Sequence, residues 1–151
     1  MRQLTRITTA LLLWGMLLVP AVAYAQLDDV PGIDDFDWNP VMNAIIEHES
    51  KGNPNVVSGQ YVGCMQISPV LVRGINLILQ KRGCARRYTL NDRRSIEKSK
   101  EMFIIMMSEY NPQHDIDRAI RLWAGGPGYS VRGTQKHVNN IRAIMRRQAG
   151  K

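Results

Sequence analysis

The chain has 151 residues, of which 44% are hydrophobic and 22% are charged, and its formal net charge is +7. This length favours one domain over several. The positive charge does not indicate binding to nucleic acid, because no recognition motif accompanies it and the chain begins with an export signal.

The first 25 residues have the parts of a secretory signal peptide. Two arginines precede a short apolar run, and the run is followed by a small-x-small cleavage site that ends at Ala25. We therefore expect the mature chain to start at Gln26 and to be exported, either periplasmic or associated with the cell wall. A membrane anchor is the alternative, although the run is short for a membrane span and Pro20 interrupts it near its end.

The next segment, 26–39, is strongly acidic. Five aspartates lie between positions 28 and 37, beside a proline and a glycine. We predict a solvated linker or N-terminal arm, and Phe36 and Trp38 are placed to hold its end against the domain at 40–151.

A helix is predicted to start with Asn39 as its N-cap and Pro40 in its first turn. Offsets of three, four and seven residues from Met42 then place Glu49 at the end of an apolar stripe. Burial there would raise the pKa of Glu49 and keep it available as a proton donor. Glu47 points away from this stripe and is expected to be solvated.

The remaining chain is predicted to be helical. Ser68 and Pro69 have the pattern of a helix start, and Asp92 is the predicted cap of a helix that runs through Met107. Apolar spacing predicts two more helices, around 116–123 and 138–145, and a short strand or loop near 59–62. The basic residues near the C-terminus suit either a solvated helix end or attraction to an anionic polymer such as the cell wall.

Three segments carry a family resemblance. They are Glu49-Ser50 followed by Asn-Pro, the Gly-Cys-Met-Gln of 63–66, and the Trp-Ala-Gly-Gly-Pro of 123–127. In this order and spacing they resemble the lytic transglycosylase domain of the goose-type lysozyme superfamily, from about position 41 to 147. The resemblance implies a mainly α fold: a single compact lysozyme-like helical domain with at most a short β or loop segment before the Met-Gln turn.

The resemblance also implies a mechanism with one acid. Glu49 would protonate the bond between N-acetylmuramic acid and N-acetylglucosamine in peptidoglycan, and the muramoyl C6 hydroxyl would then close a 1,6-anhydro ring. Ser50 and Gln66 would hydrogen-bond substrate or orient the acid, and Gly125 belongs to the substrate-binding turn. Met65 and Trp123 would form apolar walls, although core packing is an equal alternative for Trp123. The resemblance further suggests a monomer that opens the wall locally for a conjugation or secretion apparatus.

Two positions depart from the family pattern. Ala124 stands where asparagine is usual, so a side-chain amide that would bind sugar is missing. His137 stands in a Thr-x-x-Tyr-Val pattern in place of the tyrosine that commonly contacts the catalytic glutamate. These departures bear on rate and subsite preference. Two alternatives stay open: a hydrolytic muramidase on the same fold, and a catalytically weak wall-binding assembly component, which the two departures make conceivable.

No cofactor or metal is expected. His48, His114 and His137 are scattered and have no metal-ligand spacing. A continuous helix over 69–82 would be about 21 Å long and would hold Cys64 and Cys84 apart. We therefore expect no disulfide between them, unless the helix breaks at Gly74.

Overall fold

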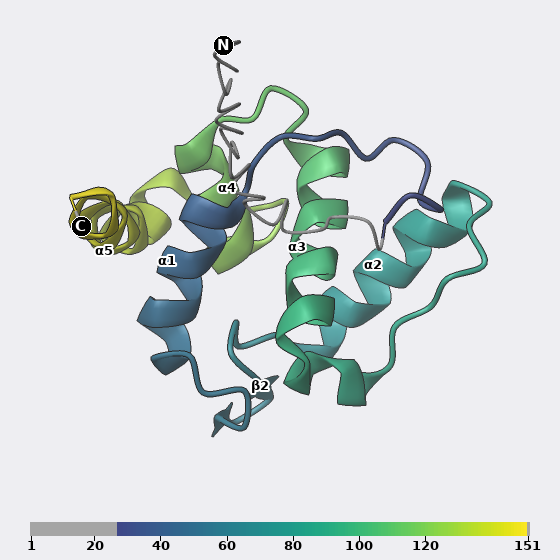
Figure 1. Ribbon diagram of the computed structural model, residues 1–151, viewed down its shortest axis with the longest axis horizontal. Helices are drawn as coiled ribbons and strands as arrows, with labels where there is room; N and C mark the ends of the chain where they lie inside the picture. The colour runs from purple at the N-terminus through teal and green to yellow at the C-terminus, as the bar shows by residue number, and fades with distance from the viewer. Residues whose placement is uncertain (1–26, 151) are drawn as a thin grey trace, which may run out of the picture.

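The computed structural model describes residues 27–150, which form a mainly helical domain with helix α3 in its middle (Figure 1). The α-helices are α1 (Asn39–Ser50), α2 (Pro69–Lys81), α3 (Ile96–Tyr110), α4 (Ile116–Gly125) and α5 (Val131–Ala149). Strands β1 (Val57–Ser58) and β2 (Tyr61–Val62) make one antiparallel hairpin, and η1 (Leu90–Arg94) is a 3-10 helix. The expected fold class is therefore confirmed, including the short β segment before the Met-Gln turn.

The expected signal peptide, 1–25, lies outside the described residues. Within 27–150, no helix is both long enough and apolar enough to cross a membrane.

Helix α3 forms the centre of the core because it is buried on several sides. Met102, Phe103, Ile105 and Met107 have no exposed surface. Ile96 is 36% exposed, because it is the first residue of the helix. The helices that carry the candidate site pack beside this core, α1 against α5 and α5 against α4.

Serine side chains cap the first turns of α2 and α3. The Ser68 hydroxyl accepts a hydrogen bond from the backbone N–H of Leu71, as predicted for α2. The predicted start at Asp92 is wrong: Ser95 caps α3, and the Asp92 carboxylate accepts hydrogen bonds from Thr89 within η1. Aspartate and serine are both favourable capping residues. Here Asp92 bonds within the 3-10 helix, and Ser95 caps the α-helix that follows.

The cap of α1 also differs from the prediction. The helix begins at Asn39, with Trp38 in the cap position and no side-chain cap bond. The Asn39 backbone N–H and side-chain amide both donate to Asp37 Oδ1, at 3.0 and 2.9 Å, so the side chain does not cap the first turn.

The described part of the acidic segment, 27–38, packs against the domain. It crosses from the α2 side of the molecule to the start of α1, drawn in purple in Figure 1. Leu27, Val30 and Trp38 are at most 4% exposed, and the Phe36 ring stacks on His114 at 4.3 Å. The arm is therefore part of the core and not a freely solvated linker.

A polar network fastens this arm. Arg86 Nη2 lies 2.6 Å from Asp29 Oδ1, and Arg86 Nη1 lies 3.1 Å from Glu101 Oε2. The Tyr88 hydroxyl donates to the same Glu101 oxygen at 2.5 Å. Glu101 is only 7% exposed, so these two partners compensate a carboxylate that burial would otherwise penalise.

Both cysteines are free and buried. Helix α2 is continuous through Gly74, which is the condition under which we expected no disulfide between Cys64 and Cys84. Burial raises the pKa of the Cys64 thiol, which disfavours the reactive thiolate.

Candidate active site

Glu49 lies in the last turn of α1, which ends where Lys51 takes a left-handed backbone conformation. Its side chain is 22% exposed, so it is partly sheltered but still reachable from solvent. The neighbouring Ser50 hydroxyl donates to the Ile46 carbonyl at 3.1 Å and accepts from the Gly52 N–H at 3.1 Å. The Ser50 hydroxyl was expected to orient the acid or to bind substrate. In the structure its hydrogen bonds hold the turn after the helix.

Other acidic side chains near α1 and in the later motifs are engaged elsewhere. Glu47 pairs with Arg147 and Gln148 on α5. Asp92 pairs with Lys98, Asp115 caps α4, and Asp117 pairs with Arg142. None of these carboxylates is positioned as a partner for Glu49.

The Met-Gln segment is fixed by a close backbone approach. Gly63 has a positive φ of 87°, and a Cβ atom there would lie 1.7 Å from the Arg93 carbonyl oxygen, so only glycine fits. The Arg93 guanidinium donates to the carbonyls of Gln60 and Ile67 at 3.0 and 3.2 Å. Arg93 thus fastens the hairpin to η1, a role that the sequence did not reveal.

Gln66 and Met65 have different environments. The Gln66 side-chain amide donates to the carbonyls of Gly63 at 2.9 Å and Val56 at 3.3 Å, which orients its carbonyl oxygen. Met65 has no exposed surface. This corrects the expectation that Met65 forms an apolar wall of the cleft: its side chain lies in the core, because the turn at Gly63 and Gln66 directs it inward.

Trp123 and Gly125 border a cavity of about 400 Å³ at the end of α4, which Tyr61 and Ser68 also line. The Trp123 ring packs on Phe103 at 5.2 Å, while its Nε1 donates to the Met65 carbonyl at 3.2 Å. Trp123 therefore serves both the core and the cavity wall. Glu49 is not among the residues that line this cavity.

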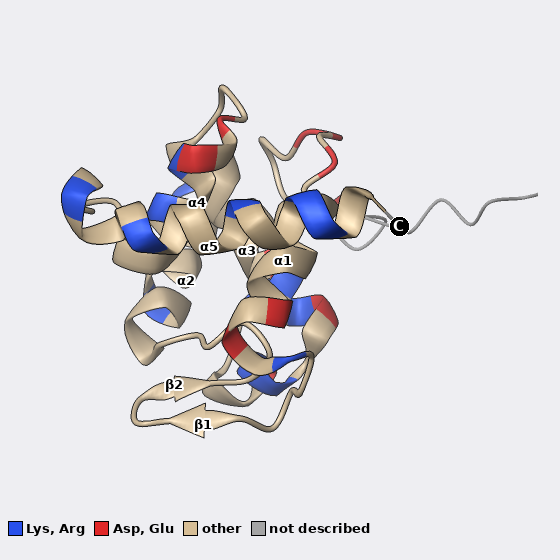
Figure 2. Ribbon diagram, turned by 90° about the vertical axis from the view of Figure 1, so that its left-hand side faces the viewer, with Lys and Arg blue, Asp and Glu red and all other residues tan. Residues whose placement is uncertain are grey.

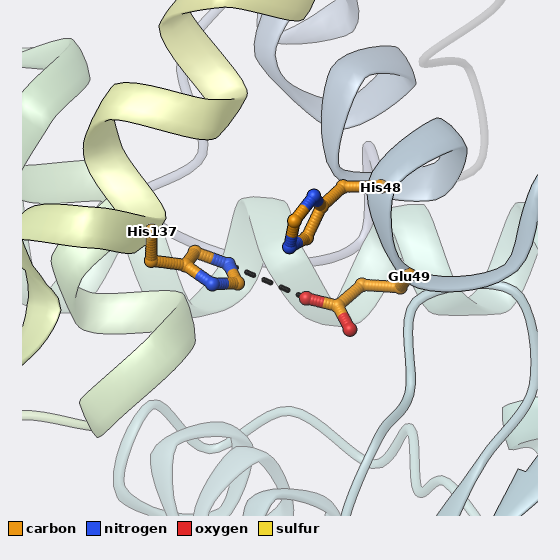
Figure 3. Close-up of side chains that lie close together, drawn as sticks. All are labelled: His48, Glu49 and His137. Carbon is orange, nitrogen blue, oxygen red and sulfur yellow. Dashed lines mark ion pairs between the residues drawn. The ribbon is translucent and has the colours of Figure 1, made fainter.

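His137 brings α5 to Glu49. Its Nε2 atom lies 3.3 Å from Glu49 Oε1, but the geometry is not that of a hydrogen bond, and this buried nitrogen has no hydrogen-bond partner among the described residues. Figure 3 shows both side chains pointing toward each other, with His48 above them. The contact expected at position 137 is therefore present at 3.3 Å, although no hydrogen bond forms.

His48 was not predicted to belong to the site. Its ring meets the His137 ring edge to face, with centroids 4.8 Å apart. Burial lowers the pKa of His48, while nearby Glu49 acts in the opposite direction. The expectation of scattered histidines is wrong for this pair, because the packing of α1 on α5 joins positions that are distant in sequence; His114 instead pairs with Asp34 at 2.8 Å.

The hairpin beside the end of α1 carries no charged residue, as Figure 2 shows for β1 and β2. The charge at this end of the molecule comes from the helices. A neutral saccharide chain could lie along such a surface without leaving buried charges unpaired.

A sequence model of the transglycosylase SLT domain matches residues 35–138. The chain belongs to this family. The match includes Glu49, the hairpin, Trp123 and His137, and also the end of the acidic arm. Comparisons with curated proteins and with solved structures gave no match. Membership in the transglycosylase SLT family indicates a transglycosylase-type enzyme that acts on peptidoglycan.

Proposed function

We propose that this protein is a peptidoglycan lytic transglycosylase in which Glu49 acts first as the acid and then as the base. The observation that carries the proposal is a half-buried carboxylate that is reachable from solvent, while Glu47, Asp92 and Asp117 pair with other side chains. Hydrolysis by two carboxylates needs a second one to activate water or to attack the sugar. A transglycosylase needs only one.

In the first step, Glu49 donates its proton to the oxygen that links N-acetylmuramic acid to N-acetylglucosamine. The bond between that oxygen and the muramoyl C1 breaks, and the N-acetylglucosamine leaves with a new hydroxyl group. The Glu49 carboxylate then accepts the proton of the muramoyl C6 hydroxyl while O6 bonds to C1. Glu49 ends protonated, no water is consumed, and the tethered hydroxyl acts at a high effective concentration.

The surrounding residues have supporting roles in this proposal. His137 positions the Glu49 carboxylate from across the α1–α5 interface. The cavity beside Trp123 and Gly125 has the volume of a small-ligand site and receives a sugar unit next to the cleaved bond. The Gln66 carbonyl oxygen, oriented by the two bonds of its amide, is placed to accept a hydrogen bond from a sugar.

The test is a digestion of purified peptidoglycan followed by mass spectrometry, with wild type beside Glu49→Gln. We expect wild type to release muropeptides with 1,6-anhydro ends, which are lighter than hydrolysis products by one water. Glu49→Gln should lower the release at least about 100-fold, because the amide can neither donate nor accept the proton. A circular dichroism spectrum equal to that of wild type would show that the variant is folded.

Two outcomes would contradict the proposal. Reducing muramic acid ends would identify a hydrolytic muramidase. Equal release by wild type and Glu49→Gln, with binding to the wall retained, would identify a wall-binding assembly component.

Export and local action extend the proposal. The leader pattern of 1–25 supports a periplasmic or wall-associated enzyme whose mature form starts at Gln26. The mass of the exported protein tests this start. We also propose that the enzyme acts as a monomer and opens the wall for a conjugation or secretion apparatus, in line with its resemblance to small single-domain members. Size-exclusion chromatography and co-purification with such an apparatus test these two points.

A further inference from the structure

Three potential metal ligands meet at the interface of α1 and α5. His48 and Glu49 come from the last turn of α1, and His137 comes from α5. One ligand atom from each side chain lies within 4.8 Å of the other two. Figure 3 shows the three side chains converging from the two helices. Within 27–150, this is the group of three such residues that could hold an ion.

The cluster has bonding capacity that the protein leaves unused. His137 Nε2 is buried and has no hydrogen-bond partner among residues 27–150. An unpaired buried nitrogen costs free energy, because it has lost its water and gained no partner. A buried imidazole nitrogen without a hydrogen-bond partner, aimed at a carboxylate, is also a group that a metal ion can bind.

The distances suit a tetrahedral ion. Two ligands that are each about 2.0–2.1 Å from a zinc ion, at the tetrahedral angle, lie about 3.4 Å apart. His137 Nε2 and Glu49 Oε1 are 3.3 Å apart. A His48 ring nitrogen lies within 4.8 Å of a ligand atom of His137 and of Glu49, so the site requires His48 to move closer when the ion binds.

We propose that His48, Glu49 and His137 bind one divalent transition metal ion of the zinc class, and that the bound ion holds the enzyme inactive. Two imidazole nitrogens and one carboxylate oxygen serve as ligands, with water in the fourth position. Such a ligand set favours Zn²⁺, Cu²⁺ or Ni²⁺ over Mg²⁺ and Ca²⁺, which prefer oxygen ligands.

Inhibition follows because Glu49 is both a ligand of the ion and the proposed proton donor. Binding of the ion displaces the proton from the carboxyl group into solvent. A carboxylate that coordinates a metal ion then carries no proton for the glycosidic oxygen. This inhibitory half rests on the proposed function, whereas the binding half rests only on the geometry of the three side chains.

The binding experiment is a calorimetric titration of the purified, untagged, metal-free protein with ZnCl₂, followed by an absorption spectrum with Co²⁺. We expect one ion per chain and a tetrahedral Co²⁺ spectrum. His48→Gln and His137→Tyr should each weaken Zn²⁺ binding at least about 10-fold, since each removes one of three ligands. The matched control is His114→Gln, which removes the histidine paired with Asp34 and should leave the affinity unchanged.

The binding half is overturned if both site variants keep the wild-type affinity, or if His114→Gln weakens binding equally. A strong thiolate charge-transfer band with Co²⁺ would also overturn it, because the ion would then be bound by Cys64 or Cys84. Two site variants are used so that a folding defect in one does not decide the result.

The activity experiment measures muropeptide release with saturating Zn²⁺ and again after addition of a chelator. We expect wild type to lose at least about 10-fold of its metal-free rate and to recover it with the chelator, whereas His48→Gln needs at least about 10-fold more Zn²⁺ for the same inhibition. Faster release with Zn²⁺, with reducing ends, would overturn the inhibitory half by making the ion a cofactor for hydrolysis. If the metal-free protein releases nothing although the ion binds at the three residues, the proposed function and the inhibitory half fail while the binding site stands.

Discussion

The network around Glu101 and the site around Glu49 are both built on a sheltered carboxylate, but they differ in how completely its hydrogen bonds are made. Glu101 accepts from Arg86 at 3.1 Å and from the Tyr88 hydroxyl at 2.5 Å, and Arg86 continues to Asp29 at 2.6 Å. Every member of that network has a partner at hydrogen-bond distance. Such a network stabilises the fold and leaves little for a ligand to add.

At the Glu49 site, in contrast, the polar groups are incompletely hydrogen-bonded. Its carboxylate has one contact with His137, at 3.3 Å and without hydrogen-bond geometry, and the His137 nitrogen is buried without a partner. This arrangement forgoes stability in the free protein. The bonds missing here are available to a substrate or to an ion, so a polar cluster with incomplete bonding is a better guide to function than a complete one.

Removing Arg86 should produce the largest loss of stability. Arg86→Met leaves Glu101, which is 7% exposed, with the Tyr88 hydroxyl as its remaining partner in the network, and should cost about 3 kcal/mol in the free energy of unfolding. Urea denaturation measures this loss. The control is Arg73→Met, an exposed arginine of α2, which should change stability by less than about 0.5 kcal/mol. Equal effects of the two variants would contradict the assigned role of the network.

Tyr88→Phe should have a smaller effect on the same network. It removes only the hydroxyl that donates to Glu101 and should cost about 1–2 kcal/mol, because a hydrogen bond to a charged group is lost while the ring remains buried. The same urea experiment applies, with Tyr61→Phe on the exposed hairpin as the control. A neutral result for Tyr88→Phe would show that Arg86 alone compensates Glu101.

Asp29→Asn should show how the network depends on pH. The bond to Arg86 lowers the pKa of the Asp29 carboxyl below its ordinary value. A carboxyl whose pKa is lower in the folded state contributes stability above its unfolded pKa of about 3.9, and this contribution disappears as the pH falls through the folded value. The stability difference between wild type and Asp29→Asn should therefore be present at neutral pH and close below about pH 4. A difference that persists in acid would exclude the charge as its cause.

Glu49→Gln should have the smallest effect on stability, in contrast to its large effect on activity. Its carboxylate has no hydrogen-bond partner among residues 27–150, so the amide should change the free energy of unfolding by less than about 0.5 kcal/mol. Thermal or urea unfolding checks this. A loss above about 2 kcal/mol would place Glu49 with Glu101 as a structural carboxylate.

Local signals in the sequence predicted much of the fold. Ser68 capped α2 as expected, and the glycines after Trp123 ended α4. Asp92 misled because it is also a good cap and lies only three residues before Ser95, the residue that caps α3. Propensity did not distinguish a 3-10 turn from the helix that follows it.

The site was only partly predictable, because its geometry depends on contacts between distant segments. Family resemblance singled out Glu49 and position 137, and the structure brings them together. His48 was missed because its place beside His137 depends on how α1 packs against α5. Met65 was misplaced because a motif does not tell which side chain faces the core. The burial of Leu27 and Val30 in the arm was not predicted, because the five aspartates of this segment indicate a solvated chain.

The indole of Trp123 offers an optical reading of the cavity. Its nitrogen donates to the Met65 carbonyl, and the ring also borders the cavity that we assign to a sugar unit. In a chain that starts at Gln26, the other tryptophan is Trp38, and its 2% exposure gives a constant background emission. A change in fluorescence upon addition of glycan fragments would then come from the indole beside the cavity. Saccharide occupancy could thus be followed in real time, without a label and without turnover.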